Sequence, residues 1–213
     1  MRKYLLAAAA VAMMAPAAHA ITVDQTDTLD VGFALTPLDA TLNFGGYTGT
    51  GTVSQVNVTY FGEIDSDISL FNTSKVSRDF SAETVTTFGY TSSVGNTSFQ
   101  VSGGTGAQTI PGGGSLTFNV TGTNSSFQSF TGAGVSPYLT PFSIDLDTVT
   151  LVGITGGGGN VLGGQSTQGF GQVTVEYLIE DIEEISPVPL PAAAWMLLIG
   201  LGSLWAFRRR THA

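Results

Sequence analysis

The chain has 213 residues, with 16 acidic and 7 basic side chains and no cysteine. Disulfides, thiol nucleophiles and cysteine-ligated metal sites are therefore excluded, and the two histidines, His19 and His212, lie near the chain ends. Five of the seven basic residues also lie there, so residues 21–187 have a net charge near −14. A surface that acidic repels phosphate backbones, and we expect no binding to nucleic acid.

The first twenty residues have the organisation of a secretory signal peptide. Arg2 and Lys3 form a positive start, and residues 4–15 are apolar. Ala18 and Ala20 place small side chains at the two positions that a signal peptidase reads. The apolar run is shorter than the roughly 20 residues that cross a bilayer. We therefore predict export through the Sec translocon and cleavage after Ala20 by signal peptidase.

Residues 21–187 form the predicted folded domain, and their composition indicates strands. Thr, Val and Phe are abundant, and several windows alternate apolar and polar residues as half-buried strands do. Runs of glycine between the windows predict turns. The predicted strands are residues 28–35, 40–44, 55–61, 68–71, 83–90, 98–102, 115–121, 148–152 and 172–179. About nine or ten short strands with frequent turns predict an all-β fold, a β-sandwich.

The alternation also predicts which side chains enter the core. The window at residues 148–152 places Val149 and Leu151 on the apolar face. Asp145 and Asp147 are spaced like a pair of glycosidase carboxylates, but they alternate with apolar residues and are expected to face solvent. The core-facing residues of that segment are Phe142, Ile144 and Leu146. We therefore predict no catalytic pair here.

Three acidic residues, Glu63, Asp65 and Asp67, are candidate ligands for calcium, which prefers clustered carboxylate oxygens. The calcium-loop pattern fails, because Leu70 stands where glycine is needed and Val76 where a bidentate glutamate is needed. A loop between two strands explains the three acids without a metal. We predict no metal and no cofactor, and a weak calcium site at these three residues remains the alternative.

The C-terminal residues 188–213 contain a predicted membrane anchor. Residues 190–207 have no charge, and as a helix they would span about 27 Å at 1.5 Å per residue, close to the ~30 Å hydrocarbon core. The predicted transmembrane helix begins at Ala192 and ends at Phe207. The stop-transfer residues after it are Arg208, Arg209 and Arg210. Three adjacent guanidinium groups keep that end in the cytoplasm and leave the β-rich domain outside.

A short proline-containing motif precedes the helix. Its residues are Val188, Pro189, Leu190, Pro191 and Ala192. Followed by an apolar span and a terminal arginine cluster, this motif resembles the VPLPA variety of the PEP-CTERM sorting signal. The resemblance implies that an exosortase, a membrane-embedded enzyme, recognises the motif as a substrate and that the helix and basic end are removed. A single-pass anchor that is never processed is the alternative.

The middle domain also resembles the opening and closing segments of the choice-of-anchor E domain. The matching segments are Phe44, residues 51–58, residues 70–74 and residues 173–177. Such domains occur on exported proteins with interchangeable C-terminal anchors. The resemblance implies location and architecture, and it implies no activity.

We therefore expect an exported, exosortase-sorted protein of the cell surface or extracellular matrix, anchored in the inner membrane in transit and associated with extracellular polysaccharide. Its role is expected to be structural or interaction-based, because residues 21–187 have no histidine or cysteine and few basic groups for catalysis. The alternative is a carbohydrate-binding module of the matrix. The candidate sugar-binding platforms are Tyr47, Tyr90 and Tyr138.

Overall fold

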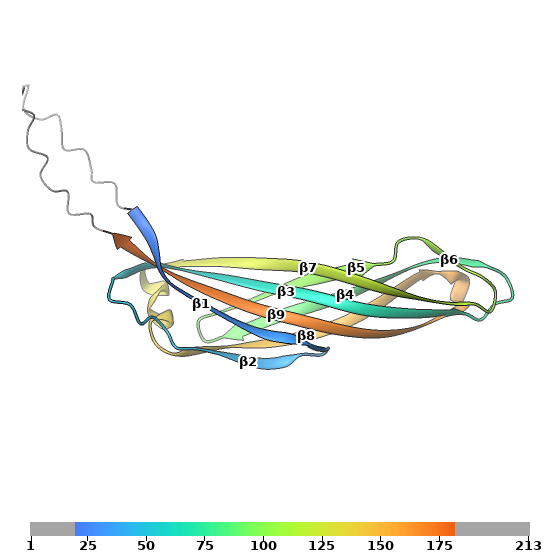
Figure 1. Ribbon diagram of the computed structural model, residues 1–213, viewed down its shortest axis with the longest axis horizontal. Helices are drawn as coiled ribbons and strands as arrows, with labels where there is room; N and C mark the ends of the chain where they lie inside the picture. The colour runs from blue at the N-terminus through green and yellow to red at the C-terminus, as the bar shows by residue number, and fades with distance from the viewer. Residues whose placement is uncertain (1–19, 182–213) are drawn as a thin grey trace, which may run out of the picture. The chain divides into compact units, whose positions relative to one another are not determined.

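The computed structural model describes residues 20–181, and nearly all of them lie in β-strands (Figure 1). Ile21–Glu180 form one compact unit. The strands are β1 (Ala20–Leu35), β2 (Asp39–Phe44), β3 (Val53–Asn72), β4 (Arg78–Ser92), β5 (Gly95–Gly104), β6 (Gln108–Ile110), β7 (Ser115–Thr131), β8 (Phe142–Gly156) and β9 (Val161–Asp181). The described residues also include three short 3-10 helices: η1 (Gly132–Gly134), η2 (Ser136–Tyr138) and η3 (Gly157–Gly159). The all-β prediction is confirmed.

The strands form two antiparallel sheets. The first has the order β1-β9-β3-β7, and the second has the order β2-β8-β4-β5, with β6 also pairing with β4. β3 pairs with β7 on one side and with β9 on the other over almost its whole length. With 20 residues, β3 is about 66 Å long at about 3.3 Å per residue. The prediction of short strands is therefore wrong for this part of the fold.

The two windows predicted as separate strands, residues 55–61 and 68–71, belong to the single strand β3. The predicted loop between them, which was to hold Glu63, Asp65 and Asp67, is also strand. The alternation continues through it, because Ile64 and Ser66 occupy inner positions and are fully buried. The sequence does not show this alternation clearly, because the inner residue Ser66 is polar and the outer residues Glu63, Asp65 and Asp67 are of types that are uncommon in strands.

The core lies between the sheets as two apolar clusters. The larger cluster includes Tyr60, Phe88 and Tyr177, and the smaller one includes Ile68 and Phe80. Between them runs a layer of buried hydroxyl side chains, which we call the polar belt. Its members are Ser66, Thr84, Thr86, Thr148 and Thr167. On β3 and β4 these residues stand between members of the two clusters, so the belt divides the core across both sheets.

Val149 and Leu151 do not face the core, so that prediction is wrong. They are 57% and 68% exposed. The buried residues Ile144 and Leu146 fix which residues of β8 face inward. Thr148 continues this inward-facing series and is 2% exposed. Its hydroxyl accepts a 2.6 Å hydrogen bond from the Leu38 amide, which satisfies a buried polar group. The threonine is the inner residue here, and its apolar neighbours are outside.

One pair of sheet edges is closed by direct contact between β5 and β7. Asn124 Nδ2 donates to the carbonyl oxygen of Gln100 at 2.8 Å, and the hydroxyls of Thr97 and Ser126 lie 3.2 Å apart. Gly122 faces Ser102 there, and a Cβ on Gly122 would fall on the Ser102 carbonyl oxygen. The absence of a side chain therefore allows the two backbones to approach.

The opposite pair of edges is covered only in part. β1 ends at Leu35, and the Thr36 amide makes a last 2.9 Å bond to the carbonyl oxygen of Thr167 on β9. The chain then crosses to the second sheet, where the Thr148 amide donates to the Leu38 carbonyl oxygen at 3.1 Å. β2 follows from Asp39. β8 and β9 continue well past this crossing (Figure 1).

Candidate functional site

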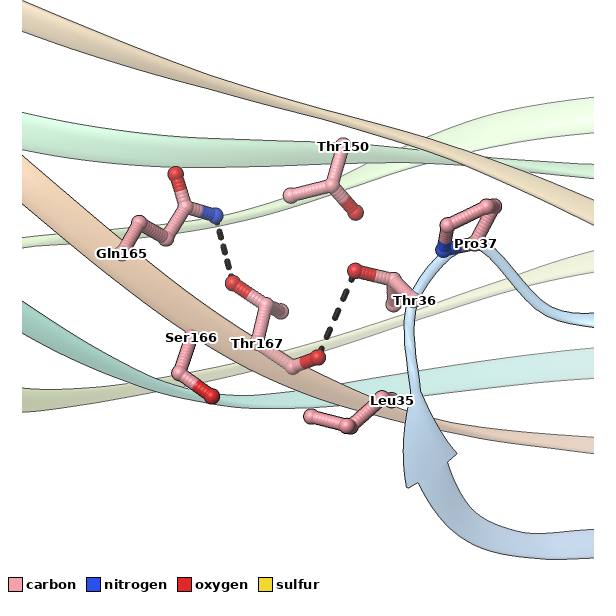
Figure 2. A pocket seen from close by; sticks show the side chains of 7 residues that line it. All are labelled: Leu35, Thr36, Pro37, Thr150, Gln165, Ser166 and Thr167. Atoms are coloured by element: carbon pink, nitrogen blue, oxygen red, sulfur yellow. Dashed lines mark hydrogen bonds between the residues drawn. The ribbon is translucent and has the colours of Figure 1, made fainter.

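The crossing from β1 to β2 forms one wall of a surface pocket of about 410 Å³. We call it the polar pocket. It is lined by Leu35, Thr36, Pro37, Thr150, Gln165, Ser166 and Thr167. Figure 2 shows these side chains converging from the crossing, from β8 and from β9. The pocket lies where the polar belt reaches the surface, because Thr167 belongs to both.

A chain of hydrogen bonds leads from the pocket into the core. Gln165 Nε2 donates to Thr167 Oγ1 at 2.5 Å (Figure 2). The same hydroxyl lies 2.7 Å from Ser66 Oγ, which lies 3.3 Å from Thr84 Oγ1. Thr36 Oγ1 donates to the Thr167 carbonyl oxygen at 3.3 Å. These bonds fix the rotamers of the pocket wall, because each buried hydroxyl has a partner.

The pocket offers neutral hydrogen-bonding groups. Its lining contains hydroxyl, amide and backbone groups and no titratable side chain. In the part of the chain that the structure describes, the side-chain hydrogen bonds of the Ser66 hydroxyl go only to the hydroxyls of Thr84 and Thr167. Activation of a serine or threonine nucleophile requires a neighbouring base, which this lining does not supply. The pocket suits an uncharged, hydroxylated ligand better than it suits acid–base chemistry.

The three candidate calcium ligands form a row on the outer face of β3. Glu63, Asp65 and Asp67 occupy alternate positions there. Asn119 Nδ2, on β7, donates to Asp65 Oδ1 at 2.6 Å and to Asp67 Oδ1 at 3.1 Å. Among residues 20–181, no group of three or more acidic or histidine side chains is arranged to hold a metal ion. An extended strand spreads the three carboxylates along its length, whereas a loop could have brought them around one ion.

The prediction that Asp145 and Asp147 face solvent is confirmed. Both are exposed on the outer face of β8, while Ile144 and Leu146, which precede each of them in the sequence, are buried. Asp145 Oδ1 accepts a 2.7 Å hydrogen bond from Thr41 Oγ1. The two carboxylates stand on an open sheet surface, which does not supply the enclosed acid–base geometry of a hydrolase.

Two of the three predicted sugar platforms are inside the core, so that prediction is wrong. Tyr90 and Tyr138 are fully buried. Tyr90 donates to the Phe61 carbonyl oxygen at 2.7 Å, and the Tyr138 ring stands edge-on to Phe142 at a centroid distance of 5.1 Å. The position of a tyrosine beside a glycine or proline does not reveal whether its ring turns inward.

Tyr47, the third candidate, is half-buried. Its ring packs against Tyr177 at a centroid distance of 5.4 Å. Its hydroxyl donates to Asp24 Oδ2 at 2.5 Å and accepts from the Gly51 amide at 3.1 Å. The hydrogen bond to the Asp24 carboxylate raises the pKa of Tyr47. The ring therefore serves to hold a loop onto the first sheet and leaves little of its face free.

An aromatic cluster on the outer face of the first sheet was not predicted. Phe170 on β9 lies 5.6 Å from Phe33 on β1 and 6.1 Å from Phe61 on β3, measured between ring centroids. Phe33 is 48% exposed. We call Phe33, Phe61 and Phe170 the aromatic row. Phe61 follows the buried Tyr60 in a strand, and this position indicates that its ring faces outward. Only the strand order brings the three rings together.

The sorting motif (Val188, Pro189, Leu190, Pro191 and Ala192), the predicted transmembrane helix and the arginine cluster lie outside the described residues. So do the signal-peptide residues 1–19. Within residues 20–181, no helix combines the length and apolar character that crossing a bilayer requires.

Comparison with known proteins finds no matching family model and no matching curated protein. Among solved structures, the chain is similar to the infectious bursal disease virus VP2 subviral particle, with 14% identity, a TM-score of 0.21, and 84% of this chain and 49% of that chain covered. The Gx strain of the same virus gives 15% identity, a TM-score of 0.18, and coverage of 90% and 52%. The chain spans about half the length of these viral chains.

Proposed function

We propose that this chain is an exported, exosortase-sorted protein of the cell surface or extracellular matrix, with a structural or interaction role and no catalytic activity. The observation that carries the proposal is the C-terminal sequence, in which a VPLPA motif, an uncharged span and three arginines follow in order. The signal-peptide pattern at the other end supports export. The N-terminal segment would direct export of the domain, and the C-terminal segment would direct its sorting.

The properties of the described domain support a passive role. The polar pocket holds neutral groups, and the acids on the outer faces of β3 and β8 stand on open sheet surfaces. The described chain begins on β1 and ends on β9, which are neighbours in the first sheet. Because the signal peptide is removed at the start of β1, the domain would be displayed from a single attachment point that follows β9. We propose that the displayed domain is associated with extracellular polysaccharide.

The sorting step is tested with an epitope tag placed after Ala213. In a host that contains the exosortase, we expect the mature protein to lose the tag, because the motif is cut before the helix. Replacing Pro189 and Pro191 with alanine should keep the tag attached, since the motif would continue into the helix instead of staying extended. Immunoblots of membrane and medium fractions measure this. A tag that stays on the unmodified chain contradicts the processing.

Carbohydrate binding is the second candidate function, and the aromatic row favours it. Exposed aromatic faces supply apolar area to sugar rings, and the row presents three rings on one sheet face. Phe170 is central, because it contacts both other rings. This candidate would place polysaccharide on the outer face of the first sheet.

Replacing Phe170 with alanine should reduce retention on the producing organism's polysaccharide by about tenfold, an effect of about 1.4 kcal/mol. Phe127 is the matched control, because it is 60% exposed on β7 of the same sheet and lies outside the row. Affinity electrophoresis of the two variants beside the unmodified protein measures the difference. Equal retention of all three would remove the aromatic row as a sugar site.

A further inference from the structure

The second sheet has a strand edge that no other strand covers. β2 pairs with β8 only from Phe142 to Asp147, whereas β8 continues to Gly156. Within residues 20–181, no strand pairs with the remainder of β8 on that side. We call residues 149–155 the open edge of β8. Figure 1 shows β8 running past the end of β2 in this region.

Backbone groups along the open edge are directed outward. The Thr148 amide donates toward the β2 side, to the carbonyl oxygen of Leu38. In an antiparallel sheet the N–H and C=O groups of every second residue point to the same side. The amide and carbonyl groups of Thr150, Val152 and Ile154 therefore point away from β4 into the open side. Such a row is a template for another strand.

The side chains around these groups are uncharged and mostly apolar. Leu151 is 68% exposed and Val152 is 40% exposed. From Thr148 to Val175 the sequence has no charged residue. Proteins usually protect free edges with charges, prolines or bulges, and β1 and β2 follow that rule. Their acids are Asp24, Asp27, Asp30 and Asp39. The open edge of β8 lacks this protection.

We propose that the open edge of β8 pairs with the same edge of a second copy of this chain, antiparallel and about a two-fold axis at Val152. In this register Thr150 pairs with Ile154 of the second copy, and Val152 pairs with its own counterpart. All three outward amides of each copy then find a carbonyl. The second sheets of the two copies join into one continuous sheet, and the contact is closed by symmetry.

Charge and length both favour a second copy as the occupant. The domain has a net charge near −14, so two copies repel one another over most of their surfaces. The uncharged edge is where they can meet without that penalty. The open edge also fits itself, because β8 leaves the strand conformation at Gly156, where φ is 91°. In the proposed register, Gly156 of the second copy lies opposite Thr148, whose amide is already bonded to Leu38. The second copy's strand therefore ends before it would collide with the crossing from β1 to β2. This inference does not depend on the proposed export or sorting.

Because the chain has no cysteine, a single introduced thiol reports the contact. In the full chain in mild detergent, we expect Val152→Cys to form a disulfide-linked dimer on mild oxidation, since two-fold-related partners in a hydrogen-bonded pair have Cα atoms about 5.5 Å apart. Ser98→Cys is the matched control, exposed on β5 at the other side of the second sheet, and should stay monomeric. Equal cross-linking of both variants, or none at Val152→Cys, would overturn the proposal.

A charge at the same position should prevent association. Val152→Lys brings two ammonium groups together across the axis, and an inward-pointing charge is a natural protection of strand edges. We expect the dimer dissociation constant to rise about tenfold or more, whereas Ser98→Lys should leave it unchanged. Sedimentation equilibrium in density-matched detergent measures both. An unchanged constant in Val152→Lys, or open-ended polymers instead of dimers in the unmodified chain, would show that the contact is not the two-fold pairing.

Discussion

Replacing Gly122 with alanine is expected to lower the free energy of unfolding by about 3 kcal/mol, at the upper end of the usual range for overpacking. The new Cβ would fall on the Ser102 carbonyl oxygen, which is backbone and cannot rotate away. β5 and β7 must then separate. Gly103, on the same seam, shows how close the backbones are, because its own Cβ would lie 2.9 Å from the Thr121 carbonyl oxygen.

Chemical denaturation of the purified protein measures this loss. Gly32→Ala is the matched control, because a Cβ on that residue of β1 meets no atom within 4 Å, and its effect should be within about 0.5 kcal/mol. In a domain of this size, 3 kcal/mol corresponds to a melting temperature lower by roughly 6–12 °C. If Gly122→Ala were as stable as Gly32→Ala, β5 and β7 would not meet at this seam.

The second large effect is expected in alkaline solution. Burial raises the pKa of Tyr60 and of Tyr177 to about 12, and burial also raises the pKa of Tyr90 and of Tyr138. In the unfolded chain these phenols lose their protons near pH 10. The folded state binds more protons than the unfolded state above that pH, so the free energy of unfolding falls as pH rises.

We expect stability that is constant below about pH 10 and falls steeply between pH 10 and about pH 12, by up to about 1.4 kcal/mol per pH unit for each such tyrosine. Denaturation midpoints across this range measure it. The ultraviolet absorbance of phenolate should appear together with unfolding. Tyr60→Phe removes one titrating group and should make the fall shallower. Four of the six tyrosines are buried, so ionisation of more than two tyrosines near pH 10 while the chain stays folded would contradict the burial of these rings.

Along β3, the sequence predicts only the part of the strand in which the inner residues are apolar. Val56, Val58 and Tyr60 were predicted to share a face and are buried together. The continuation through Gly62 and Ser66 was not predicted, because neither residue looks apolar. Gly62 is inner because the Phe88 ring packs against that position, 3.0 Å from where its Cβ would be. The inward position of Gly62 is therefore explained by packing against the second sheet and not by a local preference of the sequence.

The same limit explains the candidate sites. Tyr90 and Tyr138 were read as exposed platforms from their neighbours in sequence, yet each ring fills space between two sheets. The sequence does not predict the aromatic row, because Phe33 and Phe170 are far apart in the chain and meet only through the pairing of β1 with β9. The polar pocket depends in the same way on Thr36 meeting Thr167.

The amino-acid sequence by itself determined the all-β class and the outward direction of Asp145 and Asp147, and it is the basis of the predictions of export and sorting. These follow from local properties, namely residue type, a period of two, and continuous runs of apolar or basic residues. Only the tertiary structure decided the strand order, the polar belt, the aromatic row and the open edge of β8. Those features depend on which strands are neighbours and where each one stops, and pairing between distant segments is not encoded in any single stretch of chain.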